Sequence, residues 1–406
     1  MVFLSHMERS NYLRGGISLG SFYDDNVFNQ SSDQVGGYSL TAQPHVAVDV
    51  STTRLALKTQ YSAGFTMNQR LSAQNQGNHG LLSDLSYRLS PHVSLNIHDN
   101  FSITTGFFDQ VQSDASFSTG GILQQPNGYV ITPLSKSTNN LGSAQLSYQF
   151  GAGSLVGFSG TSFINHYRDV PTGSNLVDTT GESASAFYTH RVTPRNWVGV
   201  RYGFQRLTFD PLAEGSITHS IFYFHTINLT SHVELSFFAG PEYTSLNSQV
   251  VSTVVELPFV LVLSTPVSNS MWNGAAGASF GWQLERTALQ AQFVRRVSDG
   301  GGVQGSVNLN ALTAQVSRQI TPKTSISAGA SYAAMDPLSP SASLSQVSDS
   351  TSARFSVNRQ VGSNVALMFG YSRDWQQAAN SPSSSNFNHN RGWVTLSYDF
   401  SRPLGR

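Results

Sequence analysis

The sequence predicts an all-β protein, a transmembrane antiparallel up-and-down β-barrel of about 16 to 18 strands with short turns at one end and long loops at the other. Three observations predict this class. Charged residues make up only 11% of the 406 residues, whereas soluble domains carry roughly 25%. Apolar and polar side chains alternate with a period of two along most of the chain. Short turn signals also alternate with longer polar connections.

The composition is uniform from end to end, and it excludes several classes of function. Uniformity favours one continuous structure over two or three soluble domains. Because 23 basic residues balance 23 acidic ones and no basic run stands out, nucleic acid is excluded as a partner. Cysteine is absent, so disulfides, thiolate metal sites and cysteine nucleophiles are excluded as well.

The predicted strands are recognised by their two distinct faces. In the segment 365–375 one face carries Val365, Leu367, Phe369, Tyr371 and Trp375, and the other carries Ala366, Gly370, Ser372 and Asp374. The segment 198–205 repeats the pattern, with Val198, Val200, Tyr202 and Phe204 opposite Gly199, Arg201, Gly203 and Gln205. A helix would need apolar residues at spacings of three and four, which these segments lack.

Eight short turn signals separate these segments in pairs. They lie at 51–53, 90–92, 151–153, 193–196, 230–232, 285–287, 321–323 and 362–364. With a first strand near 14–22 and a last strand near 391–400, eight hairpins correspond to about 18 strands.

Longer connections lie between the hairpins, near 68–79, 106–138, 169–182, 246–269, 337–348 and 376–390, with shorter ones near 211–216 and 299–302. Short periplasmic turns and long extracellular loops are typical of outer-membrane barrels. The longest apolar run, 250–263, falls inside a connection expected to be polar, and it is too short for a membrane helix. It is either an extra hairpin, which would raise the count to about 20 strands, or a segment packed in the lumen.

The two faces decide between lipid and water as the surroundings. So many strands with a polar face cannot pack those faces in a soluble core, and closing about 16 to 18 of them leaves a water-filled lumen. The apolar faces must therefore point outward into lipid. Aromatic residues near strand ends are the expected interfacial girdles, namely Tyr87, Tyr148, Phe150, Tyr188, Trp197, Trp282, Trp375, Trp393, Tyr398 and Phe400.

Two segments resemble known outer-membrane proteins. The last strand, Trp393 to Phe400, ends on an aromatic residue and resembles the C-terminal signal by which Gram-negative outer-membrane barrels are recognised for insertion. The segment Gly16 to Phe28 is similar to the first strand and loop of outer-membrane barrels found with exopolysaccharide export systems. The first resemblance implies a porin-like barrel, and the second implies a role in exopolysaccharide secretion.

The expected organisation is an N-terminal segment 1–12, a single barrel 13–400 and a C-terminal tail 401–406. The first residues lack the sections of a secretory signal, so we expect such a signal to have been removed or to lie upstream. Expected partners are outer-membrane lipid, lipopolysaccharide and the barrel-assembly machinery. A homo-oligomer and a polysaccharide are left open as partners.

Charged residues on the polar faces are the candidate pore-lining residues, because charged rings set ion preference and solute orientation. They are Arg54, Lys58, Asp84, Arg88, Arg191, Arg201, Glu234, Glu242 and Asp374, together with Asp399. Both signs occur, so no strong ion selectivity is expected. The longest connection, 107–139, is either an exposed loop or a constriction folded into the barrel, in which Asp109, Asp114 and Lys136 would line the narrowing.

Neither an enzyme nor a cofactor is expected. No His-Glu-x-x-His zinc motif occurs among the 11 histidines. Asp24, Asp25 and Asn26 offer oxygen ligands, but the spacing of a dedicated calcium loop is missing, so we expect a simple loop opening. The sequence favours a passive pore for small polar solutes. A barrel for exopolysaccharide secretion and a non-conducting structural or adhesive barrel are the alternatives.

Overall fold

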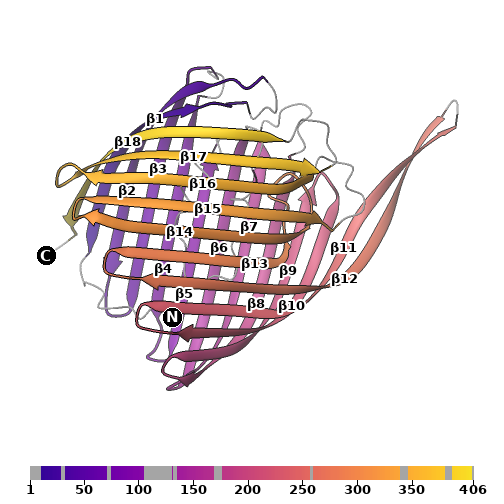
Figure 1. Cartoon of the computed structure of the whole chain (residues 1–406). Helices are drawn as coiled ribbons and strands as arrows, with labels where there is room; N and C mark the ends of the chain where they lie inside the picture. The colour runs from indigo at the N-terminus through magenta and orange to yellow at the C-terminus, as the bar shows by residue number, and fades with distance from the viewer. Residues whose placement is uncertain are drawn as a thin grey trace.

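The computed structural model describes residues 11–28, 33–70, 75–104, 130, 135–168, 176–256, 259–338, 346–379 and 386–404. These residues form one sheet of 18 antiparallel strands (Figure 1). The strands are β1 (Tyr12–Asp24), β2 (Gly37–Ser51), β3 (Leu55–Asn68), β4 (Gln76–Arg88), β5 (Val93–Thr104), β6 (Lys136–Gly151), β7 (Ser154–Arg168), β8 (Asp178–Thr193), β9 (Asn196–Asp210), β10 (Glu214–Asn228), β11 (Val233–Glu256), β12 (Phe259–Gln283), β13 (Thr287–Ser298), β14 (Val307–Thr321), β15 (Thr324–Pro337), β16 (Gln346–Gln360), β17 (Val365–Ala379) and β18 (Phe387–Pro403). Within the described ranges, no helix is long and apolar enough to cross a bilayer.

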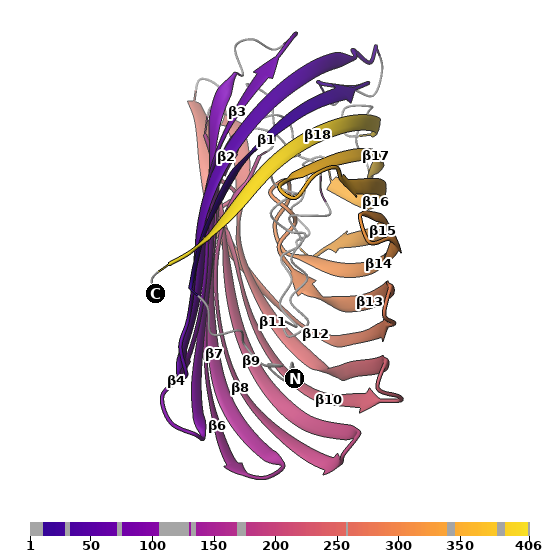
Figure 2. The same ribbon diagram turned by 90° about the vertical axis from the view of Figure 1, so that its left-hand side faces the viewer.

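The sheet closes on itself because the first strand pairs with the last. Each strand pairs with its neighbours in sequence, and β1 also pairs with β18 from Tyr12 opposite Pro403 to Asp24 opposite Arg391. Figure 2 shows the indigo strand β1 running beside the yellow strand β18 along this seam. The predicted class and strand number are confirmed, and β18 continues to Pro403, beyond the predicted end of the barrel.

The outer face of the wall is apolar and the inner face is largely polar. On β17 the outward side chains include Phe369 and Tyr371, which are 47% and 48% exposed, while the inward Ser372 and Asp374 are buried. The same alternation holds around the barrel, because every outward row carries exposed Leu, Ile, Val, Phe or Tyr side chains. A belt of this kind is stable only against lipid.

Eight of the ten predicted girdle aromatics lie exposed on the outer face, namely Tyr87, Tyr148, Phe150, Tyr188, Trp282, Trp375, Tyr398 and Phe400. The prediction was wrong for Trp197 and Trp393. Trp197 lies opposite Arg191 on the inner face, and the Arg191 guanidinium sits 5.5 Å from its ring centre. Trp393 covers the inward Gly370, where an added Cβ would lie 2.1 Å from the indole ring. In each strand the tryptophan lies at an inward position, one residue away from the outward apolar positions.

All eight predicted short turns are confirmed, and the apolar run is neither of the two predicted structures. Strands β11 and β12 continue through it, paired from Val233 opposite Trp282 to Glu256 opposite Phe259. The pairing of β10 with β11 ends at Asn247, so the upper hairpin stands free of its neighbour. Figure 1 shows it projecting beyond the rest of the barrel. The run therefore lengthens an existing hairpin because β-branched residues favour continued strand pairing.

The outward assignment can be tested at Phe369. Replacing Phe369 by Arg places a charge against the bilayer, which costs roughly 2 to 4 kcal/mol near the midplane. We expect folding into vesicles to be impaired, as measured by the heat-modifiable band on electrophoresis. Met368→Arg is the matched control, because the adjacent side chain faces the lumen and a charge there stays hydrated. Equal folding of both variants would contradict the assignment.

Candidate functional site

The connection between β13 and β14, residues 299–306, folds into the barrel and is called the internal loop here. Asp299, Gln304 and Ser306 are at most 3% exposed. The Ser306 amide donates to Glu214 Oε1 on β10 (3.2 Å), and its hydroxyl donates to Ser216 Oγ on the same strand (2.7 Å). The Leu338 amide, directly after β15, donates to the Ser306 carbonyl (3.0 Å). Contacts to inward groups of separate wall segments place the loop inside the lumen.

Two glycines let the internal loop approach the opposite wall. Gly301 and Gly302 have φ angles of 65° and 84°, a region that side chains with a Cβ rarely adopt. The Gly302 carbonyl accepts a hydrogen bond from the Val177 amide (2.8 Å), before β8. A Cβ at Gly302 would lie 2.0 Å from the Tyr167 hydroxyl on β7. The loop therefore reaches from β13 to β7 across the interior.

Apolar side chains pack around the internal loop in a cluster that we call the internal cluster. Its members come from β7, β14, β15 and three connections, and they are Val130, Tyr167, Leu176, Val303, Val307, Leu309, Ala311, Ala333 and Met335. All the connections involved are on the long-loop side, which is extracellular in barrels of this type. The lumen is thus narrowed near the extracellular mouth by a packed apolar segment.

The structure describes residue 130 and residues 135–139 of the predicted constriction loop. Val130 is 1% exposed and belongs to the internal cluster. Lys136 begins β6, paired with Arg168, so it is part of the wall. Asp109 and Asp114 lie outside the described residues. The internal loop narrows the lumen, which its short length did not suggest.

A buried carboxylate lies at the base of the internal loop. Burial raises the pKa of Asp299 from 3.8 to about 6, and the positive charge of Arg296 partly offsets that effect. Its Oδ2 has no hydrogen-bond partner among the described residues. Close by, Glu242 on β11 accepts a hydrogen bond from the Val297 amide (3.1 Å). Two acids and one arginine therefore surround the point where β13 turns inward.

Several predicted lining residues project from the inner wall toward the short-turn end. Asp84 lies opposite Lys58 and contacts His98 Nδ1 at 2.6 Å. Arg88 ends β4, Arg191 donates to the Pro194 carbonyl (3.2 Å), and Glu234 is exposed near the start of β11. Arg54 lies in the turn before β3 instead of on the wall. These groups surround the periplasmic half of the lumen.

Arg201 lies deeper, beside aromatic side chains. Its Nη2 contacts Ser185 Oγ at 2.8 Å and Ser159 Oγ at 3.4 Å. The inward rings of Phe222 and Phe238 pack together on the neighbouring strands, with ring centres 5.3 Å apart. Arg201 is also close enough to Arg296 for the two charges to interact. A cationic and aromatic wall thus stands below the internal loop.

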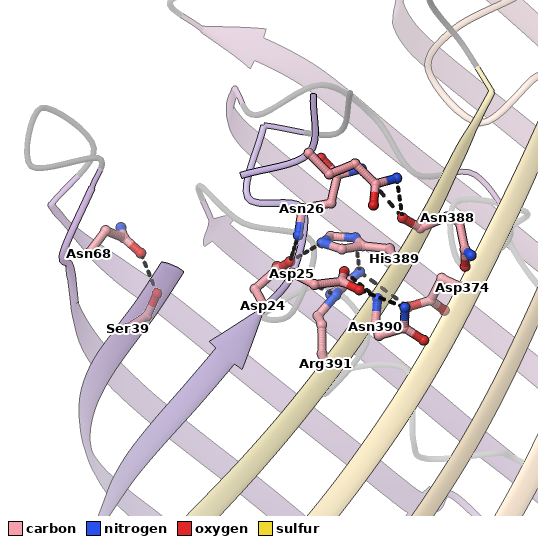
Figure 3. Close-up of polar contacts among 11 residues, drawn as sticks. Asp24, Asp25, Asn26, Ser39, Asn68, Asp374, Asn388, His389, Asn390 and Arg391 are labelled. Carbon is pink, nitrogen blue, oxygen red and sulfur yellow. Dashed lines mark hydrogen bonds and ion pairs between the residues drawn. The ribbon is translucent and has the colours of Figure 1, made fainter. Parts of the chain in front are cut away.

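Asp374 belongs to a charged cluster at the seam, made of Asp24, Asp25, Asp374, His389 and Arg391 (Figure 3). We call it the seam cluster. Arg391 Nη2 contacts Asp374 Oδ2 at 3.2 Å and donates to His389 Nδ1 (3.0 Å). The His389 Nε2 proton therefore points to Asp24, with which it pairs. Asp25 accepts hydrogen bonds from the Asn390 amide and side chain, at 2.7 and 2.6 Å.

The seam cluster links three strands at the mouth of the barrel. Asp24 ends β1, Asp374 lies on β17, and His389 and Arg391 lie on β18. Oxygen and nitrogen atoms of Asp24, Asp25 and His389 lie within 4.8 Å of one another. The hydrogen bonds among them account for this grouping. Below it, Asp399 pairs with His45 at 2.9 Å across the first strand.

Sequence reasoning missed His389, Arg391, Glu214, Arg296 and Asp299. The alternation of β18 contained the signal for two of them, because Val394 and Leu396 face outward and positions 389 and 391 then face inward. Asp299 and Glu214 had no such signal. Their role depends on a loop that meets distant strands only in the folded barrel.

Comparison with known proteins gives distant likenesses only. No protein-family model and no curated protein matches the sequence. The structure of OccK2 (OpdF) from Pseudomonas aeruginosa is 10% identical, with a TM-score of 0.45 over 96% of this chain and 98% of that one. The siderophore receptor PiuA from Acinetobacter baumannii is 8% identical, with a TM-score of 0.48 over 98% of this chain and 82% of that one. The ferric-catecholate import receptor Fiu from E. coli K12 is 11% identical, with a TM-score of 0.48 over 97% and 82%.

The architecture itself defines the class of protein. A closed barrel of 18 antiparallel strands with an apolar belt outside and polar residues inside is an outer-membrane β-barrel. The protein is therefore located in the Gram-negative outer membrane.

The buried Asp299 predicts that packing of the internal loop depends on pH. Its folded-state pKa of about 6 lies above its ordinary value of 3.8. Its contribution to stability is therefore fully present below about pH 4 and is lost as the pH rises through about 6. We expect single-channel conductance to be larger at about pH 7.5 than at about pH 5, because the internal loop packs less firmly when Asp299 is ionised. The Asp299→Asn variant should not show this difference, and an unchanged pH dependence in that variant would contradict the assignment.

The seam cluster predicts a strong effect of Arg391→Met. Removing the buried cation leaves Asp24 and Asp374 without their countercharge, which costs about 3 to 5 kcal/mol for buried pairs. Urea unfolding of the protein in lipid vesicles would measure this loss. Arg359→Met is the control, because Arg359 is exposed near the end of β16 and its loss should change stability by less than about 1 kcal/mol.

Proposed function

We propose that the protein is a passive pore for small polar solutes. The observation that carries this proposal is the polar inner wall, which bears groups of both charges on many strands. Eighteen strands enclose a lumen too wide for wall side chains alone to fill. Water therefore occupies the space below the internal loop and provides the path.

The internal loop supports a size limit on the solutes. It narrows the extracellular mouth with apolar packing, so a solute must pass beside the internal cluster. Arg201 and Arg296 stand on one part of the wall below the loop, and Glu242 lies near Arg296. A wall with fixed positive and negative groups orients dipolar solutes without strongly selecting one ion.

Exopolysaccharide secretion stays a prediction. It was based on the segment Gly16 to Phe28, whose Asp24 and Asp25 contact His389 and Asn390 of the last strand. Barrel closure therefore accounts for these acidic residues without a polysaccharide. The non-conducting barrel is favoured by one observation, the internal cluster that occupies part of the lumen. Conductance distinguishes it from a pore.

The pore proposal is tested by recording refolded protein in planar bilayers. We expect discrete conductance steps, and their absence in correctly folded protein would contradict an open pore. Gly302→Val should increase the step size, because the added side chain clashes with Tyr167 and displaces the internal loop. Gly281→Val is the matched control, since no atom lies within 4 Å of a Cβ at that inward position. Equal conductance of the two variants would contradict a constriction at the loop.

The role of Arg201 predicts a change in ion preference. Arg201→Ser removes a cation from the lumen wall and should shift the reversal potential in a salt gradient toward cation preference. Folding into vesicles should be nearly unchanged, because the neighbouring Ser159 and Ser185 are themselves polar. Arg359→Ser, on the outer face, should leave the reversal potential as it is. A shift of equal size in both variants would argue against a lining role.

A further inference from the structure

A group of polar residues interrupts the apolar outer face of β3, β4, β5 and β6. Thr59, Ser83, Asp99 and Gly142 follow one another across these strands in a single row of register partners. Asn140 lies on the same face of β6, one outward position further along. We call Thr59, Ser83, Asp99 and Asn140 the polar island.

The polar island lies within the lipid-facing belt. On β5 the outward row contains Leu95, Ile97, Asp99, Phe101 and Ile103, so two apolar residues flank the acid on each side. Ile97 is 39% exposed, and the alternate residue His98 faces the lumen, where it contacts Asp84. Asp99 therefore points away from the lumen toward hydrocarbon.

The island is partly hydrogen-bonded within itself. The Thr59 and Ser83 hydroxyl oxygens lie 3.1 Å apart, and Asn140 Nδ2 donates to Asp99 Oδ1 at 3.3 Å. Gly142 makes room for the carboxylate, because a Cβ there would lie 3.3 Å from Asp99 Oδ1. A carboxylate has about four acceptor sites, and lipid chains offer it no donors. A lone barrel in lipid would therefore hold a poorly solvated acid.

The outer surface beside the polar island carries mostly small side chains. The outward residues next to it on β6 and β7 are small, namely Gly142, Ala144, Gly160 and Ser162, and on β8 the small Ala184 lies beside Glu182, which continues the row of polar residues. Small side chains let two membrane surfaces approach closely, so that polar groups can meet across the contact.

We propose that the polar island is the centre of a two-fold interface between two copies of this chain in the membrane. The occupant is a second copy because the island is self-complementary. It carries an acceptor, Asp99, beside three donors, Thr59, Ser83 and Asn140. A two-fold axis brings the donors of each copy to the acid of the other. The assembly is independent of the proposed pore, because the island lies outside the lumen.

Single-cysteine cross-linking tests the interface directly, since the chain contains no cysteine. Ser83→Cys in lipid vesicles at low protein density should give a covalent dimer with a short bismaleimide. Leu396→Cys is the matched control, because that residue is 45% exposed on the outer face of β18. It should stay monomeric.

A second substitution separates assembly from folding. Adding Asp99→Leu to Ser83→Cys should lower dimer yield about tenfold, the effect of one polar contact between membrane surfaces. The variant should still insert, as shown by the heat-modifiable band, because leucine is favourable in lipid. Asp99→Asn should retain the dimer. The proposal is overturned if the Ser83→Cys variant stays monomeric or if positions 83 and 396 cross-link equally. It is also overturned if Asp99→Leu does not weaken the dimer, or if a trimer forms without a cross-link at position 83.

Discussion

The pairing of β1 with β18 is the constraint on which the rest of the structure depends. A sheet edge in hydrocarbon would leave backbone groups without hydrogen bonds, and each such group costs several kcal/mol. The register from Tyr12 opposite Pro403 to Asp24 opposite Arg391 removes both edges at once. Closure then fixes which residues face lipid and which face the lumen, because a shift by one residue would invert every side chain of a strand.

The buried charges depend on the same closure. Asp24 meets His389 and Arg391 only because residues more than 360 positions apart become neighbours at the seam. The internal loop likewise finds Glu214, Val177 and Leu338 because the closed wall holds β10, β8 and β15 around one lumen. An open sheet of the same strands would present neither set of partners. The seam cluster and the internal loop are therefore tertiary features of a barrel whose individual strands are specified by the local sequence.

The strands of the barrel wall could be predicted because the sequence pattern that specifies each hairpin is local. Alternation with a period of two and paired turn signals specify each hairpin within about thirty residues. Prediction failed where a residue departs from the phase of its strand, as for Trp197, and where contacts span the lumen. The internal loop was predicted only as a short connection, because its glycines indicate no more than a turn. Its burial depends on Tyr167 and Glu214, which lie on distant strands. The run 250–263 was misread as an extra hairpin or a segment packed in the lumen, because the length of a strand is set by pairing and the pattern alone does not limit it.

The long β11–β12 hairpin also determines how far the protein reaches from the cell. Nine residues of β11, from 248 to 256, continue past its pairing with β10, which ends at Asn247. At about 3.3 Å per residue this adds about 30 Å of paired backbone. The outer edges of this ribbon carry peptide groups that only water or another extended chain can satisfy. The ribbon stands above the neighbouring rim and is the part of the described structure that extends farthest on the long-loop side (Figure 1).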